Sequence, residues 1–190
     1  EAPPPMPTRT LQDASGAETT LAAYQGEVVV LNLWATWCAP CVEEMPTLGA
    51  LQRRFGDRLR VIPISVDSEA DRARAQAQLA ELSGGSLPFL IDISRGVLFD
   101  AQAPGMPVTI IYGRDGSELA RLAGGADWDS PEAVAMLEKR APMVSHLLLL
   151  VDASGASAVV ERAPGEPLFV RRGEGDILPV TNHFEGPLAS

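Results

Sequence analysis

Cysteine, histidine and lysine are scarce in this chain of 190 residues. It has two cysteines, two histidines and a single lysine, Lys139. Two cysteines cannot build a disulfide-rich scaffold, and they cannot make a zinc site of four cysteine ligands. Basic residues number 15 against 25 acidic ones, and the net charge of −10 argues against nucleic acid and anionic membrane surfaces as partners.

Long apolar runs are also lacking, because no stretch reaches the length of a transmembrane helix and no signal-peptide pattern is visible. Residues 1–7 are rich in proline and begin without methionine. We therefore expect a linker that remained after a signal or membrane anchor was removed. Hydrophobic residues make up 46% of the chain, enough for a core of ordinary size. We expect one domain over residues 8–141 and an appendage over residues 142–190.

The two cysteines, Cys38 and Cys41, lie three residues apart between a predicted strand and a predicted helix. Residues 28–34 are apolar and β-branched, which predicts a buried strand, and residues 42–55 place apolar side chains on one helical face. We expect Cys38 in the first turn of this helix, where free N–H groups and the positive end of the dipole favour the nucleophilic thiolate. Cys41 faces the same side one turn later, so it can close a disulfide with Cys38.

Three other roles compete with redox chemistry for this cysteine pair. A structural disulfide across so short a loop removes little entropy from the unfolded chain, so it would stabilise the fold only weakly. A zinc site would need His146 and His183, which lie far along the chain without ligand-like spacing. Two buried, inert cysteines are the third alternative, and the position between strand and helix argues against it. We favour a redox-active pair and expect no metal.

Residues 30–41 (VLNLWATWCAPC), followed within three residues by Glu-Met-Pro, resemble the thioredoxin superfamily. They are most similar to its TlpA-like, membrane-tethered periplasmic branch, which includes the ResA and cytochrome c maturation reductases. A second motif, GMPVT at residues 105–109, resembles the cis-proline loop of this family. The resemblance covers about residues 8–141. It departs from thioredoxin at Asn32, where thioredoxin carries a buried aspartate, and an amide cannot take a proton from Cys41.

The pattern of apolar runs and turns predicts an α/β fold of the thioredoxin type, a mixed sheet with helices on both faces. Strands are expected at residues 28–34, 60–66, 87–93, 108–112 and 118–122, and helices at 21–24, 42–55, 69–82, 97–101 and 131–140. We expect the first of these strands to be central and parallel, and Pro63 to mark a bulge or a local edge. Ser68 and Ser130 are the expected helix caps. The resemblance implies that residues 67–103 are the α/β insertion of the TlpA-like branch.

Residues 142–190 predict a β-meander that is too small to be stable alone. Strands are expected at residues 145–151, 156–161, 168–171 and 177–180. This segment resembles an interior stretch of the Ntn-type linear amide hydrolases, in which the residue matching Asn182 would help to stabilise an oxyanion. The N-terminal nucleophilic cysteine of that family has no counterpart here. We expect His183 to be a turn or surface residue, and the segment to pack on the domain or on a second copy of the chain.

The thioredoxin resemblance implies a thiol–disulfide oxidoreductase, and we expect a periplasmic reductase of partner-protein disulfides that uses Cys38 and Cys41. The residues expected to contact the substrate are Trp37, Ala39, Pro40, Met106 and Pro107. Glu43 and Glu44 lie near the positive end of the helix and are candidates for a proton relay, although two solvated carboxylates are the plainer interpretation. We expect no cofactor besides the disulfide itself.

The resemblance also implies particular partners. Clients would be disulfide-containing proteins such as apocytochrome c or copper-site assembly proteins, and a membrane thiol reductant would recycle the dithiol. The direction of electron flow stays open at this point. Two rival functions are a thioredoxin-fold binding protein whose tail docks a partner or a second copy, and an amide hydrolase. A concentration-dependent dimer would favour the first rival, and hydrolysis of penicillin V or a conjugated bile salt would favour the second.

Overall fold

The computed structural model describes residues 5–141 and, in the remainder of the chain, the four strands at residues 146–151, 157–162, 169–172 and 176–179. The chain separates into two compact units, Glu1–Ala141 and Pro142–Ser190. The first unit contains the cysteine pair and all of the described helices. None of these helices is both long and apolar enough to cross a membrane.

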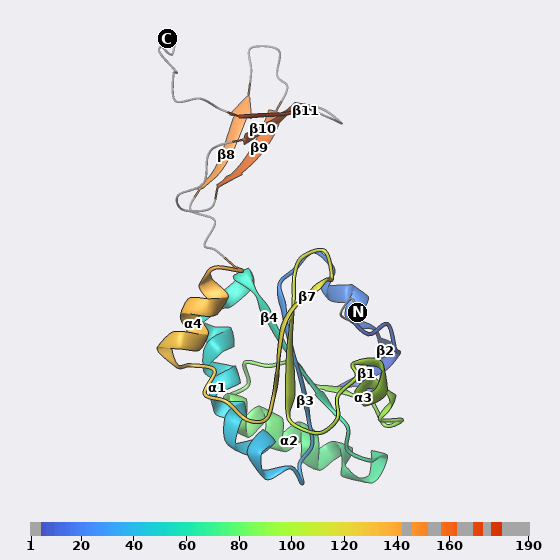
Figure 1. Cartoon of the computed structure of the whole chain (residues 1–190). Helices are drawn as coiled ribbons and strands as arrows, with labels where there is room; N and C mark the ends of the chain where they lie inside the picture. The colour runs from blue at the N-terminus through green and yellow to red at the C-terminus, as the bar shows by residue number, and fades with distance from the viewer. Residues whose placement is uncertain (1–4, 142–145, 152–156, 163–168, 173–175, 180–190) are drawn as a thin grey trace. The chain divides into compact units, whose positions relative to one another are not determined.

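The first unit is built on a seven-stranded sheet in the order β2-β1-β5-β4-β3-β6-β7. Its strands are β1 Leu11–Asp13, β2 Glu18–Thr19, β3 Val29–Trp34, β4 Arg60–Ser65, β5 Leu90–Ile91, β6 Val108–Tyr112 and β7 Glu118–Ala123. Its helices are η1 Leu21–Tyr24, α1 Ala39–Phe55, η2 Gly56–Arg58, η3 Glu69–Asp71, α2 Arg72–Ser83, α3 Gly96–Asp100 and α4 Pro131–Glu138. In Figure 1, α1 and α4 lie on one side of the strands and α3 on the other. The predicted mixed sheet with helices on both faces is confirmed.

The central strand is β3, and every side chain from Val29 to Trp34 is buried. β3 runs parallel to β4 and antiparallel to β6, so the prediction of a parallel strand holds on one side only. A continuous apolar run reports burial on both faces of a sheet, and it does not report the direction of the neighbouring strands. This position places the end of β3, and the cysteines that follow it, in the middle of one sheet edge.

Helix α1 begins at Ala39, three residues before the predicted start, and Cys38 is its N-cap rather than part of its first turn. The helix can start here because Pro40 occupies the first turn, where backbone N–H groups have no partner within the helix. The N–H of Val42 donates to the carbonyl of Cys38 at 3.1 Å and closes the first turn. The buried residues of the helix form one stripe, which consists of Cys41, Glu44, Met45, Leu48, Gly49, Leu51 and Phe55.

Strand β5 is much shorter than the predicted strand at residues 87–93. Pro88 has no N–H for a ladder, and the Asp92 carboxylate accepts hydrogen bonds from the N–H groups of Ser94 (3.0 Å) and Val97 (2.7 Å). These bonds turn the chain toward α3 directly after β5. Because β4 pairs with β5 only from Ile64 onward, Pro63 lies on a local edge of β4, one of the two predicted alternatives.

The two expected helix caps behave differently. The Ser130 hydroxyl accepts a hydrogen bond from the N–H of Ala133 at 3.3 Å, which confirms that cap, although α4 ends at Glu138 rather than Arg140. The Ser68 hydroxyl instead donates to the Asp71 carboxylate at 2.7 Å, so the prediction of a side-chain cap there was wrong. The helical segment after Ser68 opens with the tighter turn η3, and in the described residues no backbone N–H donates to the Ser68 hydroxyl oxygen, which is the bond that a side-chain cap would make.

The second unit contains β8 His146–Val151, β9 Ser157–Arg162, β10 Phe169–Arg172 and β11 Asp176–Pro179. β8 pairs antiparallel with β9, and β10 with β11. In the described residues these ladders form two two-stranded sheets, and the meander over residues 142–190 stays a prediction. His146 begins β8, and Asn182 and His183 lie outside the described residues.

Candidate active site

Cys38 and Cys41 form a disulfide at the start of α1, and their Cα atoms are 5.3 Å apart. Cys41 is fully buried on the inner stripe of the helix, whereas Cys38 keeps 7% of its surface exposed. The side chain before them, Trp37, is 59% exposed. Cys38 is therefore the sulfur nearer to solvent, and an incoming group would reach it beside the open face of Trp37.

The backbone around Cys38 forms a tight turn between β3 and α1. The N–H of Cys38 donates to the carbonyl of Ala35 at 3.1 Å, so Thr36 and Trp37 occupy the two central positions of this turn. As N-cap, Cys38 sits beside the first N–H groups of α1, which carry the positive end of the helix dipole. A helix end favours a thiolate over a thiol, whereas burial away from charge disfavours it, so the prediction that Cys38 is the reactive thiol follows from these two positions.

Glu44 lies one turn after Cys41 on the same buried stripe, and only 3% of its surface is exposed. Its carboxylate accepts hydrogen bonds from the Asn32 side chain (2.7 Å), the Ala126 N–H (3.1 Å) and the Trp128 indole (3.3 Å). Removal from water raises the pKa of Glu44 above its ordinary value, and the three hydrogen bonds offset only part of that rise. A buried carboxyl with a raised pKa stays protonated to higher pH than a solvated one.

The two glutamates predicted as relay candidates therefore differ. Glu43 is exposed, in keeping with a solvated carboxylate, but the same interpretation was wrong for Glu44. The helical stripe itself carries the signal that sequence reasoning missed. Counting back from Leu48 in steps of three and four residues places both Glu44 and Cys41 on the buried face.

Asn32 lies on β3, at the position where thioredoxin carries an aspartate, and it is fully buried. Its amide nitrogen donates to Glu44 and also to the Thr109 hydroxyl on β6 at 3.0 Å. Among the described residues its side-chain oxygen has no hydrogen-bond partner. Asn32 therefore joins α1 to β6 through the sheet, and the titratable group of this cluster is Glu44 rather than the residue on β3.

The second predicted motif precedes β6, and the Met106–Pro107 peptide bond is cis. Pro107 is buried and Met106 is half-buried. The next residue, Val108, pairs with Leu33 near the end of β3. This register brings the loop to the same edge of the sheet as Cys38. Ala39 and Pro40, which were predicted to contact the substrate, are exposed in the first turn of α1 and belong to that edge as well.

Sequence reasoning missed several residues that support this site. Trp128 and Ala126 hold the Glu44 carboxylate from a loop more than 80 residues away, and Asp67 binds the turn before Cys38 from the end of β4. These contacts depend on the strand order and on loop positions. The Asp67 position alone carried a signal, since a polar residue directly after a buried parallel strand lies at the same sheet edge as the cysteines.

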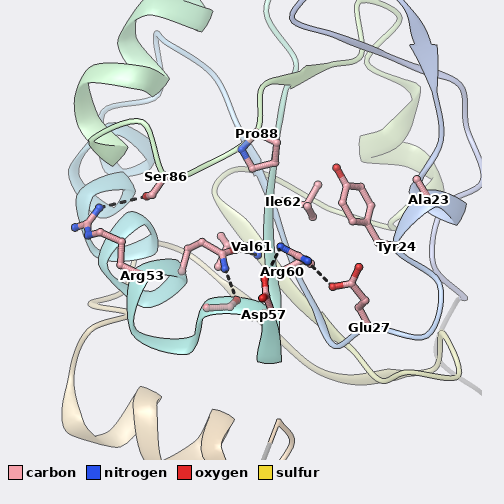
Figure 2. A pocket seen from close by; sticks show the side chains of 12 residues that line it. Ala23, Tyr24, Glu27, Arg53, Asp57, Arg60, Val61, Ile62, Ser86 and Pro88 are labelled. Atoms are coloured by element: carbon pink, nitrogen blue, oxygen red, sulfur yellow. Dashed lines mark hydrogen bonds and ion pairs between the residues drawn. The ribbon is translucent and has the colours of Figure 1, made fainter. Parts of the chain in front are cut away.

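A separate hollow of about 520 Å³ lies at the opposite edge of the sheet, where β4 begins and α1 ends (Figure 2). Its charged groups are already paired. Arg60 binds Glu27 at 2.5 Å and Asp57 at 3.4 Å, and Arg53 donates to the Ser86 hydroxyl at 3.2 Å. The hollow contains neither cysteine and is remote from both motifs, so we assign the chemistry to the disulfide edge.

A metal site finds no support in the described part of the chain. There, no three His, Cys, Asp or Glu side chains lie close enough together to hold an ion. The two histidines that a zinc site would have required are His146, in the second unit, and His183, which falls outside the description.

The fold and the disulfide define a thioredoxin-like protein with a Cys-x-x-Cys pair at the start of a helix. The sequence model of the AhpC/TSA family matches residues 4–117, and the chain belongs to that family. The thioredoxin domain of a thiol-disulfide oxidoreductase from Bacteroides vulgatus has the same fold, with a TM-score of 0.61 and 21% identity. That match covers 74% of this chain and 98% of the other.

Two relatives are similar over most of the first unit. The thioredoxin-like protein YneN of Bacillus subtilis is 33% identical over 110 residues, which are 58% of this chain and 64% of the relative. The thiol-disulfide oxidoreductase ResA of Geobacillus kaustophilus is 30% identical over 119 residues, 62% of this chain and 67% of the relative. The matched part thus spans about two thirds of the length of these relatives.

Proposed function

We propose that this protein is a thiol–disulfide oxidoreductase that reduces disulfides in partner proteins. The observation that carries the proposal is the Cys38–Cys41 disulfide, in which the more accessible sulfur is the N-cap of α1 and the other is fully buried. The relatives named as oxidoreductases support it. A purely structural disulfide would need neither a helix N-terminus nor a buried carboxyl one turn away.

The proposed reaction starts from the reduced protein. The Cys38 thiolate attacks one sulfur of the client disulfide, and the other client sulfur leaves as a thiolate. Cys41 then attacks the Cys38 sulfur of the mixed disulfide, which releases the second client thiolate. Two electrons have moved to the client, and Cys38 and Cys41 end as the disulfide seen in the structure.

Glu44 is the proposed proton acceptor for Cys41. Cys41 must lose its thiol proton before it can attack, and in this chain the position of the thioredoxin aspartate holds an amide, Asn32. Glu44 follows Cys41 by three residues on the same helix face, and burial raises its pKa toward the range in which a carboxyl exchanges protons with a thiol. The hydrogen bonds from Asn32 and Trp128 fix the carboxylate in place. The exposed Glu43 is left with no part in this step.

Client recognition is proposed to use the surface around Cys38. Trp37, Ala39 and Pro40 are exposed beside it, and Met106 and Pro107 reach the same sheet edge through the pairing of β6 with β3. An extended client segment could pair with the backbone of this loop, as peptides pair with other sheet edges. No cofactor is needed, because the dithiol itself carries the electrons.

The cellular setting is proposed from the sequence. The TlpA-like resemblance favours the periplasm, with the chain held at a membrane or secreted. Clients would be apocytochrome c or copper-site proteins, and a membrane thiol reductant would return electrons to Cys38 and Cys41. Each of these partners would exchange a thiol or a disulfide with Cys38 and Cys41.

The decisive experiment traps the reaction halfway. Cys41→Ser should accumulate mixed disulfides with clients through Cys38, because the resolving thiol is gone, and the matched Cys38→Ser should accumulate few. In the reduced wild type, alkylation at mildly acidic pH should label Cys38 before Cys41. Equal labelling, or trapping by Cys38→Ser alone, would overturn the assignment.

The reduction potential of the disulfide tests the direction of electron flow. A strongly reducing value supports the reductase, whereas a value near that of DsbA, about −120 mV, would make the protein an oxidant. The measurement needs only equilibration against a thiol buffer and does not depend on knowing the client.

A further inference from the structure

We propose that Asp67 is a positioning residue for the redox turn, acting with Thr36 and Arg74 to fix where Cys38 sits at the start of α1. Asp67 follows β4 and is fully buried. It belongs neither to the cysteine motif at residues 30–41 nor to the proline loop at residues 105–109. This inference rests on the proposed redox function of Cys38. It assigns a task to a buried carboxylate that the disulfide-exchange steps do not themselves use.

The contacts of Asp67 converge on one residue of the turn. Its carboxylate accepts the Thr36 N–H at 3.0 Å and the Thr36 hydroxyl at 2.7 Å. It also accepts the Ser65 hydroxyl at 2.8 Å, and the N–H of Asp67 donates to that same hydroxyl oxygen at 3.1 Å. Both carboxylate oxygens are therefore hydrogen-bonded, and backbone and side chain of Thr36 are held together.

The charge of this carboxylate is balanced indirectly. In the described residues no Arg, Lys or His forms an ion pair with Asp67. Arg74, on α2, instead donates to the Thr36 hydroxyl at 2.7 Å, and it also pairs with Asp71 at 3.2 Å. The Thr36 hydroxyl thus receives a hydrogen bond from a cation and gives one to a buried anion. Hydrogen bonds linked in this way strengthen one another.

We call the hydrogen bonds from Thr36 to Asp67 the clamp. Thr36, the residue that the clamp holds, determines the direction of the turn before Cys38. Thr36 follows Ala35, whose carbonyl accepts the Cys38 N–H, so fixing Thr36 fixes the direction from which Trp37 and Cys38 leave β3. Thiolate stabilisation by a helix end falls off within the first turn, so a small displacement of Cys38 weakens it. The clamp therefore acts on reactivity through position.

A positional role and a charge role predict opposite changes. If Asp67 acted mainly by its negative charge, it would disfavour a thiolate nearby, and its removal would make Cys38 react at lower pH. If it positions the turn, its removal lets Cys38 move from the helix end, and Cys38 reacts only at higher pH. The conservative Asp67→Asn keeps an acceptor for Thr36 while it removes the charge, so it separates the two roles.

The experiment measures the rate of alkylation of Cys38 by iodoacetamide as a function of pH, in the reduced full-length protein. Asp67→Ala should slow the reaction at pH 6 roughly three- to fivefold and move the profile to higher pH, the size expected for a weakened helix-end interaction. Asp67→Asn should stay within about twofold of wild type, because the acceptor is retained. A shift to lower pH in both variants, or no shift in Asp67→Ala, would overturn the proposal.

A second variant keeps the test decisive if Asp67→Ala does not fold. Thr36→Val preserves shape but deletes the hydroxyl, so it should slow alkylation at pH 6 at least about twofold. Where Asp67→Ala does fold, the double variant should react about as slowly as Asp67→Ala alone, because both substitutions break the same hydrogen bonds. A Thr36→Val rate equal to that of wild type would contradict the proposal.

The matched control is Asp92→Ala. Asp92 is also a buried carboxylate that holds a loop, through Ser94 and Val97, but that loop leads to α3. Asp92→Ala should lower the thermal stability without changing the pH dependence of Cys38 alkylation. If Asp92→Ala shifted that pH dependence as much as Asp67→Ala does, the Asp67 effect would reflect general destabilisation of the fold.

The alkylation test does not depend on the proposed function, because it needs no client. A wild type that reduces no disulfide would overturn the proposed function, while the alkylation rates would still show whether Asp67 positions Cys38.

Discussion

Asn32 and Glu44 are buried together between β3 and α1, and only Glu44 can carry a charge. The Asn32 amide donates one hydrogen bond to Glu44 and one to Thr109, so it holds the carboxyl without competing for its proton. Burial is the largest influence on Glu44, and it raises the pKa. The arrangement makes the stability of the protein depend on pH in a direction that can be worked out.

A carboxyl with a raised pKa in the folded state binds its proton more tightly there than in the unfolded chain. Its contribution to stability is fully present below the ordinary pKa of glutamate, near 4.5, and is lost as pH rises through the folded pKa. The wild type should therefore lose stability across that window. Above it the loss is complete, and the remaining hydrogen bonds hold an ionised group.

Glu44→Gln should remove this pH dependence. The variant and wild type should be close in stability below pH 4, and the variant should gain stability relative to wild type as pH rises. The substituted side chain can be accommodated because the Asn32 amide can turn its unpartnered oxygen toward the new amide nitrogen. Thermal unfolding from pH 3.5 to 8 provides the measurement.

Glu43→Gln is the control for this series, because Glu43 is exposed one position earlier on the same helix. It should follow wild type at every pH. A Glu44→Gln variant that instead loses stability relative to wild type as pH rises would show that the folded pKa is lowered. The same variant should also release clients more slowly, visible as longer-lived mixed disulfides, since an amide cannot accept the Cys41 proton.

At the scale of whole elements, one edge of β4 is hydrogen-bonded to a side chain where a neighbouring strand is missing. β5 pairs with β4 only at Ile64 and Ser65, so the first half of β4 has no neighbouring strand on that side. The Gln52 side chain, from α1, accepts the Val61 N–H at 2.8 Å and donates to the Leu59 carbonyl at 3.1 Å and the Gly56 carbonyl at 2.8 Å. Pro63 has no N–H to satisfy. Helix and strand are thereby joined where the ladder stops.

Replacing this amide should destabilise the fold and spare the chemistry. Gln52→Leu keeps the approximate size but leaves one N–H and two carbonyls without their partner, which should cost about 1–3 kcal/mol in urea unfolding. Gln78→Leu, on α2, is a suitable control because Gln78 makes no side-chain hydrogen bond in the described residues. The Cys38 alkylation profile should not change, since Gln52 lies at the far end of α1. Equal stability of the two variants would show that the edge needs no side-chain partner.

Several helices and strands could be predicted from the sequence because the residues that determine them lie close together in the chain. The apolar run of β3 and the Ser130 cap of α4 could be predicted because each is encoded within a few residues. The strand at 87–93 was overestimated because Asp92 ends it through backbone contacts that the apolar pattern does not show. The parallel direction predicted for β3 holds toward β4 but not toward β6, because burial on both faces looks the same for parallel and antiparallel neighbours.

The candidate site divides in the same way. The cysteine pair and the proline loop are short motifs, and resemblance to a family was enough to locate them. The burial of Glu44 could have been counted from the helical stripe, but its partners Ala126 and Trp128 come from a loop far along the chain. The hold of Asp67 on Thr36 depends on β3 and β4 being parallel neighbours, a pairing that no local pattern specifies.

At the scale of the whole molecule, the two units have separate sheets. Every described ladder of the first unit uses residues up to Ala123, and β8 to β11 pair only among themselves in the described part of the chain. The cysteines, Glu44 and Asp67 all belong to the first unit. The redox chemistry proposed here therefore requires nothing that the structure places after Ala141.

Deleting residues 143–190 tests this division. The shortened protein should keep its insulin-reductase activity within about twofold, because the sheet, the disulfide and the buried carboxyl are all retained. We expect its solubility or oligomeric state to change, since the sequence LLLLV at residues 147–151 is apolar and is predicted to need cover by other protein surface. Sedimentation of the two forms over a range of concentrations would show whether that surface belongs to a second copy.

The control for this deletion is Cys38→Ser in both the full-length and the shortened protein, which gives the background rate of the insulin assay. If the shortened protein folded, by its circular dichroism and melting, and yet lost activity while full-length protein reduced insulin, the second unit would be part of the active site and the division argued here would be wrong.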